Sequence, residues 1–282
     1  MAKTTTTKDK KTTQLNTWDQ KLAEEARIAA GSESNVSAGK FISTDGGLFF
    51  NEQQLPGNEM AVIILDSVHE NVYYDTPFSK GTTNSPACFA FSHNHTDERL
   101  PMFEPMCPHA DAPRPQADAC IGCPHNEFGS AKVGAGKACR NVRRLAVIGA
   151  GQFTRDGSFD AITDPKHYEE TEVAYLKLPV TSTKGFALWV KQQASTLQRP
   201  PHGLFARIRW VEDDDNQFRI EFEALAKVPD KLMQVVMKRR EDQVEKTAFP
   251  YVAREVQAPV KGGKQKPAAG GKKPANKRAY SR

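Results

Sequence analysis

Residues 107–139 read CPHADAPRPQADACIGCPHNEFGSAKVGAGKAC and hold four of the five cysteines of the chain. The spacing is C-x12-C-x2-C-x15-C, in which the central C-x2-C brings two thiolates to one tetrahedral ion and the outlying pair can complete its shell. Prolines and glycines interrupt the whole stretch, so it cannot form regular ladders or a core of its own. A bound metal, at roughly 10–16 kcal/mol of apparent binding free energy, would then supply the folding energy of this loop.

We expect this metal to be a structural Zn²⁺. The predicted ligands are Cys107, Cys120, Cys123 and Cys139. An iron–sulfur cluster is the alternative cofactor for four thiolates, and His109 or His125 could replace one of the cysteines. A disulfide framework is disfavoured because the cysteine count is odd and the first fifteen residues lack the apolar segment of a secretory signal.

Regular structure is expected on both sides of a metal loop that spans residues 92–139. Apolar runs and alternating patterns predict strands over residues 60–65, 68–74, 87–91, 143–148, 173–180, 204–211 and 217–224. Helical patterns cover residues 17–31, 182–197 and 230–240, the last with Asp230 as its cap. These elements predict an α+β fold, with a mainly antiparallel sheet or a small OB-like barrel, two or three helices and a zinc-stabilised loop.

The charge of the chain is unevenly distributed. The net charge is +5, but residues 254–282 carry nine basic side chains and one acid, and residues 1–16 carry four lysines and one aspartate. The central part, 17–253, therefore has a net charge of −6. We expect disordered basic tails over 1–16 and 254–282, a helix and linker over 17–40, and a folded body over 41–253.

Nucleic-acid binding by an acidic body requires a local basic patch. Such a run extends from residue 132 to residue 144 with no acid between its members: Lys132, Lys137, Arg140, Arg143 and Arg144. A run of this density favours phosphate binding, although a solvated face is the plain alternative. The chain contains no stretch near 20 apolar residues, so no membrane span is predicted. We expect a cytoplasmic protein.

The sequence around the cysteines resembles a family of bacteriophage-encoded proteins whose first sequence element consists of CxxCPxNxxGS followed by GxGKxCxNxRRL. The matching segments are CIGCPHNEFGS, residues 120–130, and GAGKACRNVRRL, residues 134–145. A second element of that family is similar to LPVTSTKGF, residues 178–186. The resemblance covers roughly residues 41–228 and implies single-stranded DNA binding in phage replication or recombination, with single-stranded DNA and proteins of those processes as partners. Many single-strand binders end in an acidic tail, whereas this chain ends in a basic one.

Binding of single strands also requires exposed rings on which bases stack. The predicted stacking residues are Phe50, Tyr73, Phe128 and Trp210. We expect a binding protein that is not an enzyme and that has little sequence preference. The alternatives are a metal-dependent nuclease or recombination accessory enzyme, and a zinc-containing transcriptional regulator. The GxGK segment lacks the upstream glycine and the following Ser or Thr of a phosphate-binding P-loop, which disfavours nucleotide hydrolysis.

Overall fold

The computed structural model describes residues 21, 22, 25, 41–76, 85–93, 104–249 and 251. Its elements, in chain order, are β1 Phe41–Ile42, β2 Phe49–Phe50, β3 Gln53–Gln54, β4 Glu59–Tyr73, β5 Cys88–Ser92, β6 Cys139–Phe153, β7 Phe159–Ala161, α2 Pro165–Glu170, β8 Ala174–Leu178, α3 Val180–Thr196, β9 Leu204–Asp213, β10 Gln217–Lys227 and α4 Asp230–Val244. Short 3₁₀ turns lie at Pro56–Asn58, Pro124–Asn126 and Pro201–Gly203. The predicted tails, 1–16 and 254–282, lie outside the described residues.

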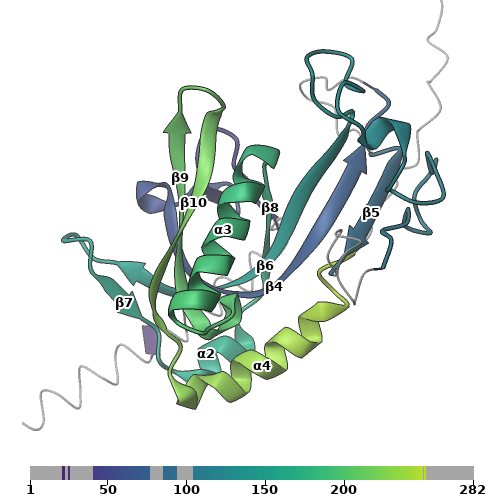
Figure 1. The fold of residues 1–282 in the computed structure, drawn as a ribbon. Coiled ribbons are helices and arrows are strands. Elements are labelled where there is room, and N and C mark those ends of the chain that lie inside the picture. The colour runs from purple at the N-terminus through teal and green to yellow at the C-terminus, as the bar shows by residue number, and fades with distance from the viewer. Residues whose placement is uncertain are drawn as a thin grey trace, which may run out of the picture. The chain divides into compact units, whose positions relative to one another are not determined.

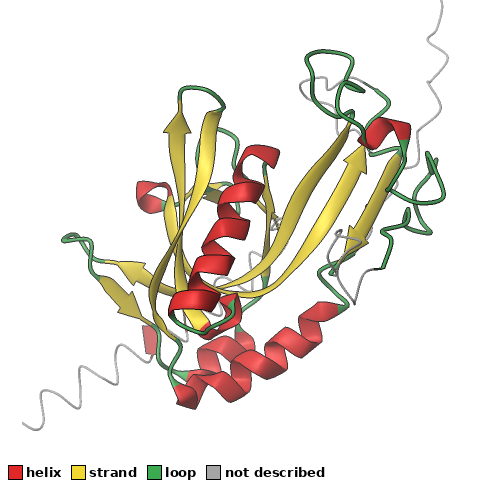
Figure 2. Cartoon of the chain, viewed as in Figure 1, coloured by secondary structure: helices red, strands yellow, loops and turns green. Residues whose placement is uncertain are grey.

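The centre of the fold is an open sheet with the strand order β1-β8-β6-β4-β9-β10 (Figures 1 and 2). β5 adds to β4 and β7 adds to β6, while β2 and β3 form a separate hairpin. Every pairing is antiparallel except that of β1 with β8. The prediction of a mainly antiparallel α+β fold is confirmed. Within the described ranges the sheet does not close, so the OB-like barrel that was its alternative is not formed.

Helices cover both faces of one end of this sheet. On one face, Phe186 and Trp189 of α3 pack on alternate residues of the central strands, among them Val62, Leu145 and Val147. On the other face, α2 and α4 pack on the intervening residues: Ile63, Leu65, Ile148 and Phe205. Because β4 is covered on both faces, its sequence is almost continuously apolar at this end.

The long strands β4 and β6 run beyond α3 and carry β5 and the cysteine-containing loop at their far end (Figure 1). The sequence predicted two strands in the region that β4 spans alone. The register of β4 against β6 shifts between Ile64 and Asp66, and this irregularity interrupts the alternation from which one strand would be recognised. β6 begins at Cys139, four residues before the predicted strand start at residue 143.

The loop that precedes β6 has almost no interior. Of residues 104–138, the buried ones are Met106, Ala112 and Cys123. Main-chain hydrogen bonds attach its first part to β5, since the amides of His109 and Arg114 donate to the carbonyl oxygens of Phe89 and Ala87. The expectation that this segment builds no core of its own is confirmed.

The helices differ from expectation mainly at their ends. α3 begins two residues before the predicted start, and α4 extends four residues beyond the predicted end. Pro229 occupies the N-cap of α4, and Asp230 is the first helical residue rather than the cap. The short helix α2 and the strand β7 were not predicted. Lys21, Leu22 and Glu25, from the predicted N-terminal helix, are helical, and the rest of that helix lies outside the described residues.

Candidate functional site

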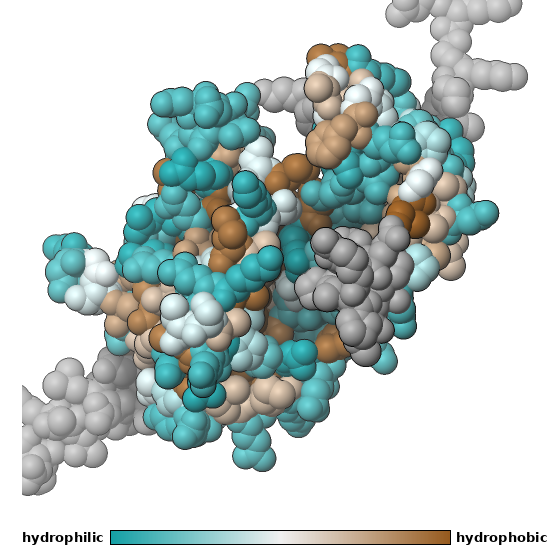
Figure 3. All heavy atoms as spheres, viewed as in Figure 1, coloured by the Kyte–Doolittle hydropathy of each residue, from teal (hydrophilic) through white to brown (hydrophobic). Residues whose placement is uncertain are grey.

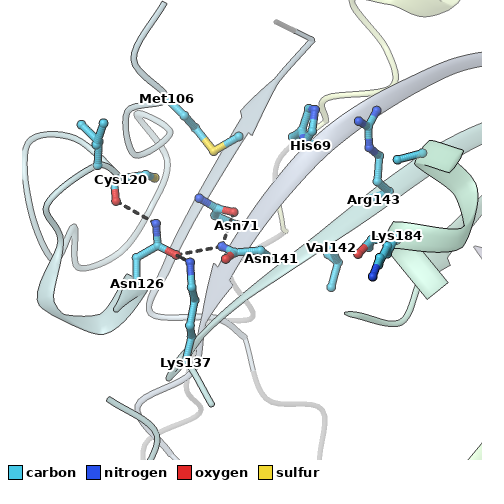
Figure 4. Close-up of a pocket in the computed structure, with 13 residues that line it drawn as sticks. His69, Asn71, Met106, Cys120, Asn126, Lys137, Asn141, Val142, Arg143 and Lys184 are labelled. Atoms are coloured by element: carbon cyan, nitrogen blue, oxygen red, sulfur yellow. Dashed lines mark hydrogen bonds between the residues drawn. The ribbon is translucent and has the colours of Figure 1, made fainter. Parts of the chain in front are cut away.

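A groove of about 470 Å³ lies between α3 and the loop before β6, with the β4–β6 ladder as its floor (Figure 4). His69 and Asn71 of β4 and Asn141 and Arg143 of β6 face the same side of the ladder, because His69 pairs with Arg143 and Asn71 with Asn141. The remaining lining residues are Met106, Cys120, Ile121, Asn126 and Lys137 from the loop, Val142 from β6, and Thr183, Lys184 and Ala187 from α3. The volume falls within the range of ligand-binding clefts, about 300–1,000 Å³.

The groove is basic. Lys137 reaches it from the loop, Arg143 from the floor and Lys184 from the first turns of α3. None of the thirteen lining residues is an aspartate or a glutamate. Three cations from separate elements thus face one concave surface without a lining carboxylate, in a body whose overall charge is negative.

Arg143 is held in place from two sides. Its Nη1 donates to the hydroxyl of Ser67 at 3.3 Å, and its guanidinium lies 5.7 Å from the ring centre of Phe186. Burial lowers the pKa of Arg143 below its usual value. An arginine remains protonated under such a shift, so the groove keeps this charge in a partly desolvated place, where it attracts an anion more strongly than at an open surface.

Three asparagines tie the floor of the groove to its loop wall (Figure 4). Asn141 Nδ2 donates to Asn71 Oδ1 at 2.6 Å and to Asn126 Oδ1 at 2.9 Å. Asn126 Oδ1 also accepts from Lys137 Nζ at 3.3 Å, and Asn126 Nδ2 donates to the carbonyl oxygen of Cys120 at 2.9 Å. The network fixes the position of Lys137 and joins the β4–β6 ladder to the C-x2-C segment.

The outer part of the loop exposes apolar side chains. Phe128 is 83% exposed, Val133 is 90% exposed and Ile121 is 49% exposed. Lys137 Nζ lies 5.1 Å from the ring centre of Phe128, so a cation and an open aromatic face stand side by side. In Figure 3 hydrophilic residues cover most of this side of the molecule, and small hydrophobic patches lie on α3 and on the loop.

A second, much smaller cavity, of about 20 Å³, lies beneath the same loop. Four cysteines line it: Cys88, Cys120, Cys123 and Cys139. Cys123 and Cys139 are buried, and Cys88 and Cys120 are half-buried. Burial, and next the neighbouring sulfurs of Cys120, Cys88 and Cys123, raises the pKa of Cys139 to about 12. Gly122 has a φ of 72°, a left-handed conformation that suits glycine and turns the chain between Cys120 and Cys123.

Cys107, one of the four predicted ligands, lies apart from this cavity. It is exposed, and its thiol donates to the carbonyl oxygen of Pro105 at 3.5 Å. Among the residues that the structure describes, no three His, Cys, Asp or Glu side chains are already arranged to hold a metal ion, so the zinc-stabilised loop remains a prediction. His125 lines the cavity, with its ring stacked on Tyr73 at 4.2 Å, whereas His109 stacks on Phe89.

The structure divides the predicted basic run. Lys132 is exposed on the outer loop, and Lys137 and Arg143 line the groove. Arg140 is exposed, but it alternates with Asn141 along β6 and therefore belongs to the opposite face of the strand. Arg144, on that opposite face, is 1% exposed and pairs with Glu70 at 3.0 Å, so we remove it from the candidate DNA contacts.

The predicted stacking residues also separate. Phe128 is open to solvent, as stacking requires. Phe50 is partly buried against the core beneath α3, and Tyr73 is covered by His125. Trp210 stacks on Phe218, with ring centres 5.5 Å apart, and its indole N–H donates to the carbonyl oxygen of Thr44. Phe128 therefore remains the strongest stacking candidate of the four.

Several lining residues were missed by reasoning from sequence. Lys184 and Thr183 come from the segment LPVTSTKGF, which carries part of the phage-family resemblance, so a signal for them existed. His69 and Cys88 had no such signal, because each reaches its site through strand pairing over a long sequence distance.

Comparisons with known proteins returned no matching family model, no matching curated protein and no matching solved structure. Each helix within the described ranges is too short or too polar to cross a lipid bilayer. The resemblance to phage-encoded proteins therefore rests on the sequence motifs alone.

Proposed function

We propose that this chain binds single-stranded DNA along the groove between α3 and the cysteine-containing loop. The observation that carries the proposal is the convergence of Lys137, Arg143 and Lys184 on a concave surface whose described lining residues include no carboxylate. Phosphate oxygens bind such cations, and release of condensed counterions drives the association. A local basic groove also explains how a body of net charge −6 can bind a polyanion.

The remaining surface suits unpaired bases. Phe128 offers an open ring beside Lys137, and base–aromatic stacking contributes about 1–3 kcal/mol per base. Asn141 lies on the floor, and although its NH₂ group already donates to Asn71 and Asn126, its carboxamide oxygen can accept a hydrogen bond from a base edge that duplex DNA conceals. Cations, an exposed ring and a neutral amide together favour single strands over duplex, with little preference for sequence.

The two sequence elements of the phage-family resemblance meet at this groove. The first supplies Asn126, Lys137 and Arg143, and the second supplies Thr183 and Lys184. Elements that are separated by residues 146–177 in the sequence thus line one surface, which supports a shared role in binding. The biological setting that the resemblance implies, replication or recombination of phage DNA in the host cytoplasm, is part of the proposal.

The test is a titration of fluorescently labelled oligonucleotides, single-stranded and duplex, at several salt concentrations. Affinity for the single strand should exceed affinity for the duplex, and its logarithm should fall with log salt at a slope of about −0.7 per phosphate contacted. Lys184→Glu should weaken binding, because it places a carboxylate in the groove. Lys238→Glu is the matched control: it makes the same charge change at an exposed position of α4, against the opposite face of the sheet.

Three outcomes would overturn the assignment. Equal losses from Lys184→Glu and Lys238→Glu would mean that net charge, and not the groove, governs binding. Tighter binding to duplex would favour the transcriptional regulator, and cleavage of the oligonucleotide with Mg²⁺ would favour the nuclease.

A further inference from the structure

Strand pairing brings together two cysteines that lie far apart in sequence. Tyr73 of β4 pairs with Cys88 on one side and with Cys139 on the other. Residues paired directly across antiparallel strands point to the same face of the sheet, so both thiols lie on the face that carries the loop. Cys88 was the one cysteine outside the 107–139 cluster and was not among the predicted ligands.

The loop places two more thiols over these two. Cys120 and Cys123 line the 20 Å³ cavity together with Cys88 and Cys139, and Cys107 is absent from its lining. A void needs about 10–15 Å³ to hold one water-sized body, so the 20 Å³ between these residues leaves room for about one ion. Exposure separates the cysteines in the same way, because Cys107 is exposed whereas the other four are half-buried or buried.

We propose that Cys88, Cys120, Cys123 and Cys139 bind one Zn²⁺, with Cys88 in the place that the sequence spacing assigned to Cys107. Four sulfur donors suit a structural, tetrahedral zinc site with no open position. The inference stands apart from the proposed DNA binding, since it concerns what holds the loop and not what the groove binds.

Binding is a proton exchange as well as a coordination. Each of the four thiols loses its proton to solvent and donates a sulfur electron pair to the ion, so one Zn²⁺ replaces four protons and the site carries a net charge of −2. Lys137 is joined to the main chain at Cys120 through Asn126, which accepts from its Nζ and donates to the Cys120 carbonyl oxygen, so its positive charge can offset part of this negative charge. The ion must draw the thiols inward, as metals do in small sites that become ordered on binding.

The test compares Cys88→Ser with Cys107→Ser, using zinc alone as the probe. Wild type and Cys107→Ser should each contain about one zinc per chain, the stoichiometry of a single tetrahedral site. Cys88→Ser should lose at least about tenfold in affinity, measured by competition with a chromophoric chelator, since loss of even an outer-shell partner costs 10–100-fold. If Cys88→Ser keeps its zinc and Cys107→Ser loses it, the ligands are the four cysteines predicted from the sequence spacing, and the proposal is overturned.

Alkylation of the wild-type protein tests the same point without a variant. In the zinc-loaded native protein Cys107 should react with iodoacetamide while the four proposed ligands stay protected, and chelation of zinc should expose Cys88 and Cys120. Protection of Cys107 with free reaction of Cys88 would overturn the proposal. So would purified protein with no zinc, or with the visible absorption of an iron–sulfur cluster, and so would a Cys88 whose reactivity is unchanged by chelation.

Discussion

Arg143 and Arg144 are neighbours in sequence but lie on opposite faces of β6. Arg143 lines the basic groove, whereas Arg144 is buried, with its Nε 3.0 Å from a carboxylate oxygen of Glu70. Arg144 Nη1 also donates to the carbonyl oxygens of Thr247 and Phe249, at 3.2 and 2.8 Å. Adjacent strand residues alternate between faces, so one arginine is available to a ligand and the other fixes the segment after α4 to the sheet.

The rings around Arg144 strengthen this assignment. Its guanidinium lies 4.3 Å from the ring centre of Phe249 and 4.5 Å from that of Phe91. Its partner Glu70 is fully buried. Glu70 Oε1 also forms an ion pair with Lys177 Nζ at 2.8 Å and accepts a hydrogen bond from the hydroxyl of Tyr251. Removing one partner from such a cluster leaves a buried charge uncompensated, and this is more costly than the loss of an exposed pair.

We therefore expect the same substitution to have different effects at the two positions. Arg144→Met should lower the free energy of unfolding by about 3–5 kcal/mol, the usual cost of breaking a buried ion pair. Arg143→Met should leave most of the stability intact but weaken single-strand binding and lower its salt slope by about 0.7, the share of one phosphate contact. Urea unfolding and oligonucleotide titration measure the two effects. Reduced affinity of folded Arg144→Met with unchanged stability would contradict the assignment.

Phe128→Ala tests the stacking surface. The ring is 83% exposed, so its removal should change the free energy of unfolding by no more than about 0.5 kcal/mol. Single-strand affinity should fall by about 1–3 kcal/mol if one base stacks there. Val133→Ala, at a 90% exposed position of the same loop, is the control and should leave affinity unchanged. Equal effects of the two variants would mean that the loop contributes apolar surface but no specific stacking.

The contrast between the arginines shows what the sequence could and could not predict. Period-2 alternation along the strand predicted for residues 143–148 already places Arg143 and Arg144 on opposite faces, so their separation was predictable. The partner of Arg144 was not, because Glu70 lies 74 positions away and meets it only through the β4–β6 pairing. Local patterns predicted most strands and helices for the same reason: they depend on neighbouring residues.

The cysteines show the same limit. Spacing favours Cys107 because it is close to Cys120 in sequence, yet Cys88 approaches the other thiols through pairing of β5 and β6 with the same residue of β4. Strand order cannot be derived from periodicity, so the edge on which β5 lies was open at the sequence level. The groove was beyond prediction for a similar reason, since its walls belong to a loop and a helix that are separated by the whole of β6, β7, α2 and β8.

Acid should weaken the Glu70 cluster. Burial alone would raise the pKa of Glu70, but Lys177 and Arg144 outweigh it and hold the pKa below its ordinary value of 4.5. The unfolded chain thus binds this proton more readily than the folded chain, so the contribution to stability is present above pH 4.5 and is lost as the pH falls through the folded pKa. The difference in unfolding free energy between wild type and Glu70→Gln should therefore shrink as the pH is lowered from 4.5 through the pKa of Glu70 in the folded protein. A difference that stays constant with pH would show that Glu70 does not titrate there.

The basic segment 254–282 allows a separate test of the body. Its net charge of +8 should attract DNA over a long range without distinguishing single strands from duplex. The truncation should end after Ala253, because Tyr251 contacts Glu70 and Lys177, and Phe249 accepts a hydrogen bond from Arg144. The shortened protein should bind single strands more weakly at low salt but keep its preference for them over duplex, as measured by titration.

A second form of the protein separates charge from length in this test. In it, the lysines and arginines of residues 254–282 are replaced by glutamine, which removes the basic charge but keeps the chain. It should behave like the truncated protein, because charge and not contact is the proposed contribution of this segment. Affinity equal to that of the full chain in both forms would remove any role for the segment in DNA binding. Loss of all binding in both would be the more serious result, since Lys137, Arg143 and Lys184 would then not suffice for a body of net charge −6 to hold single-stranded DNA.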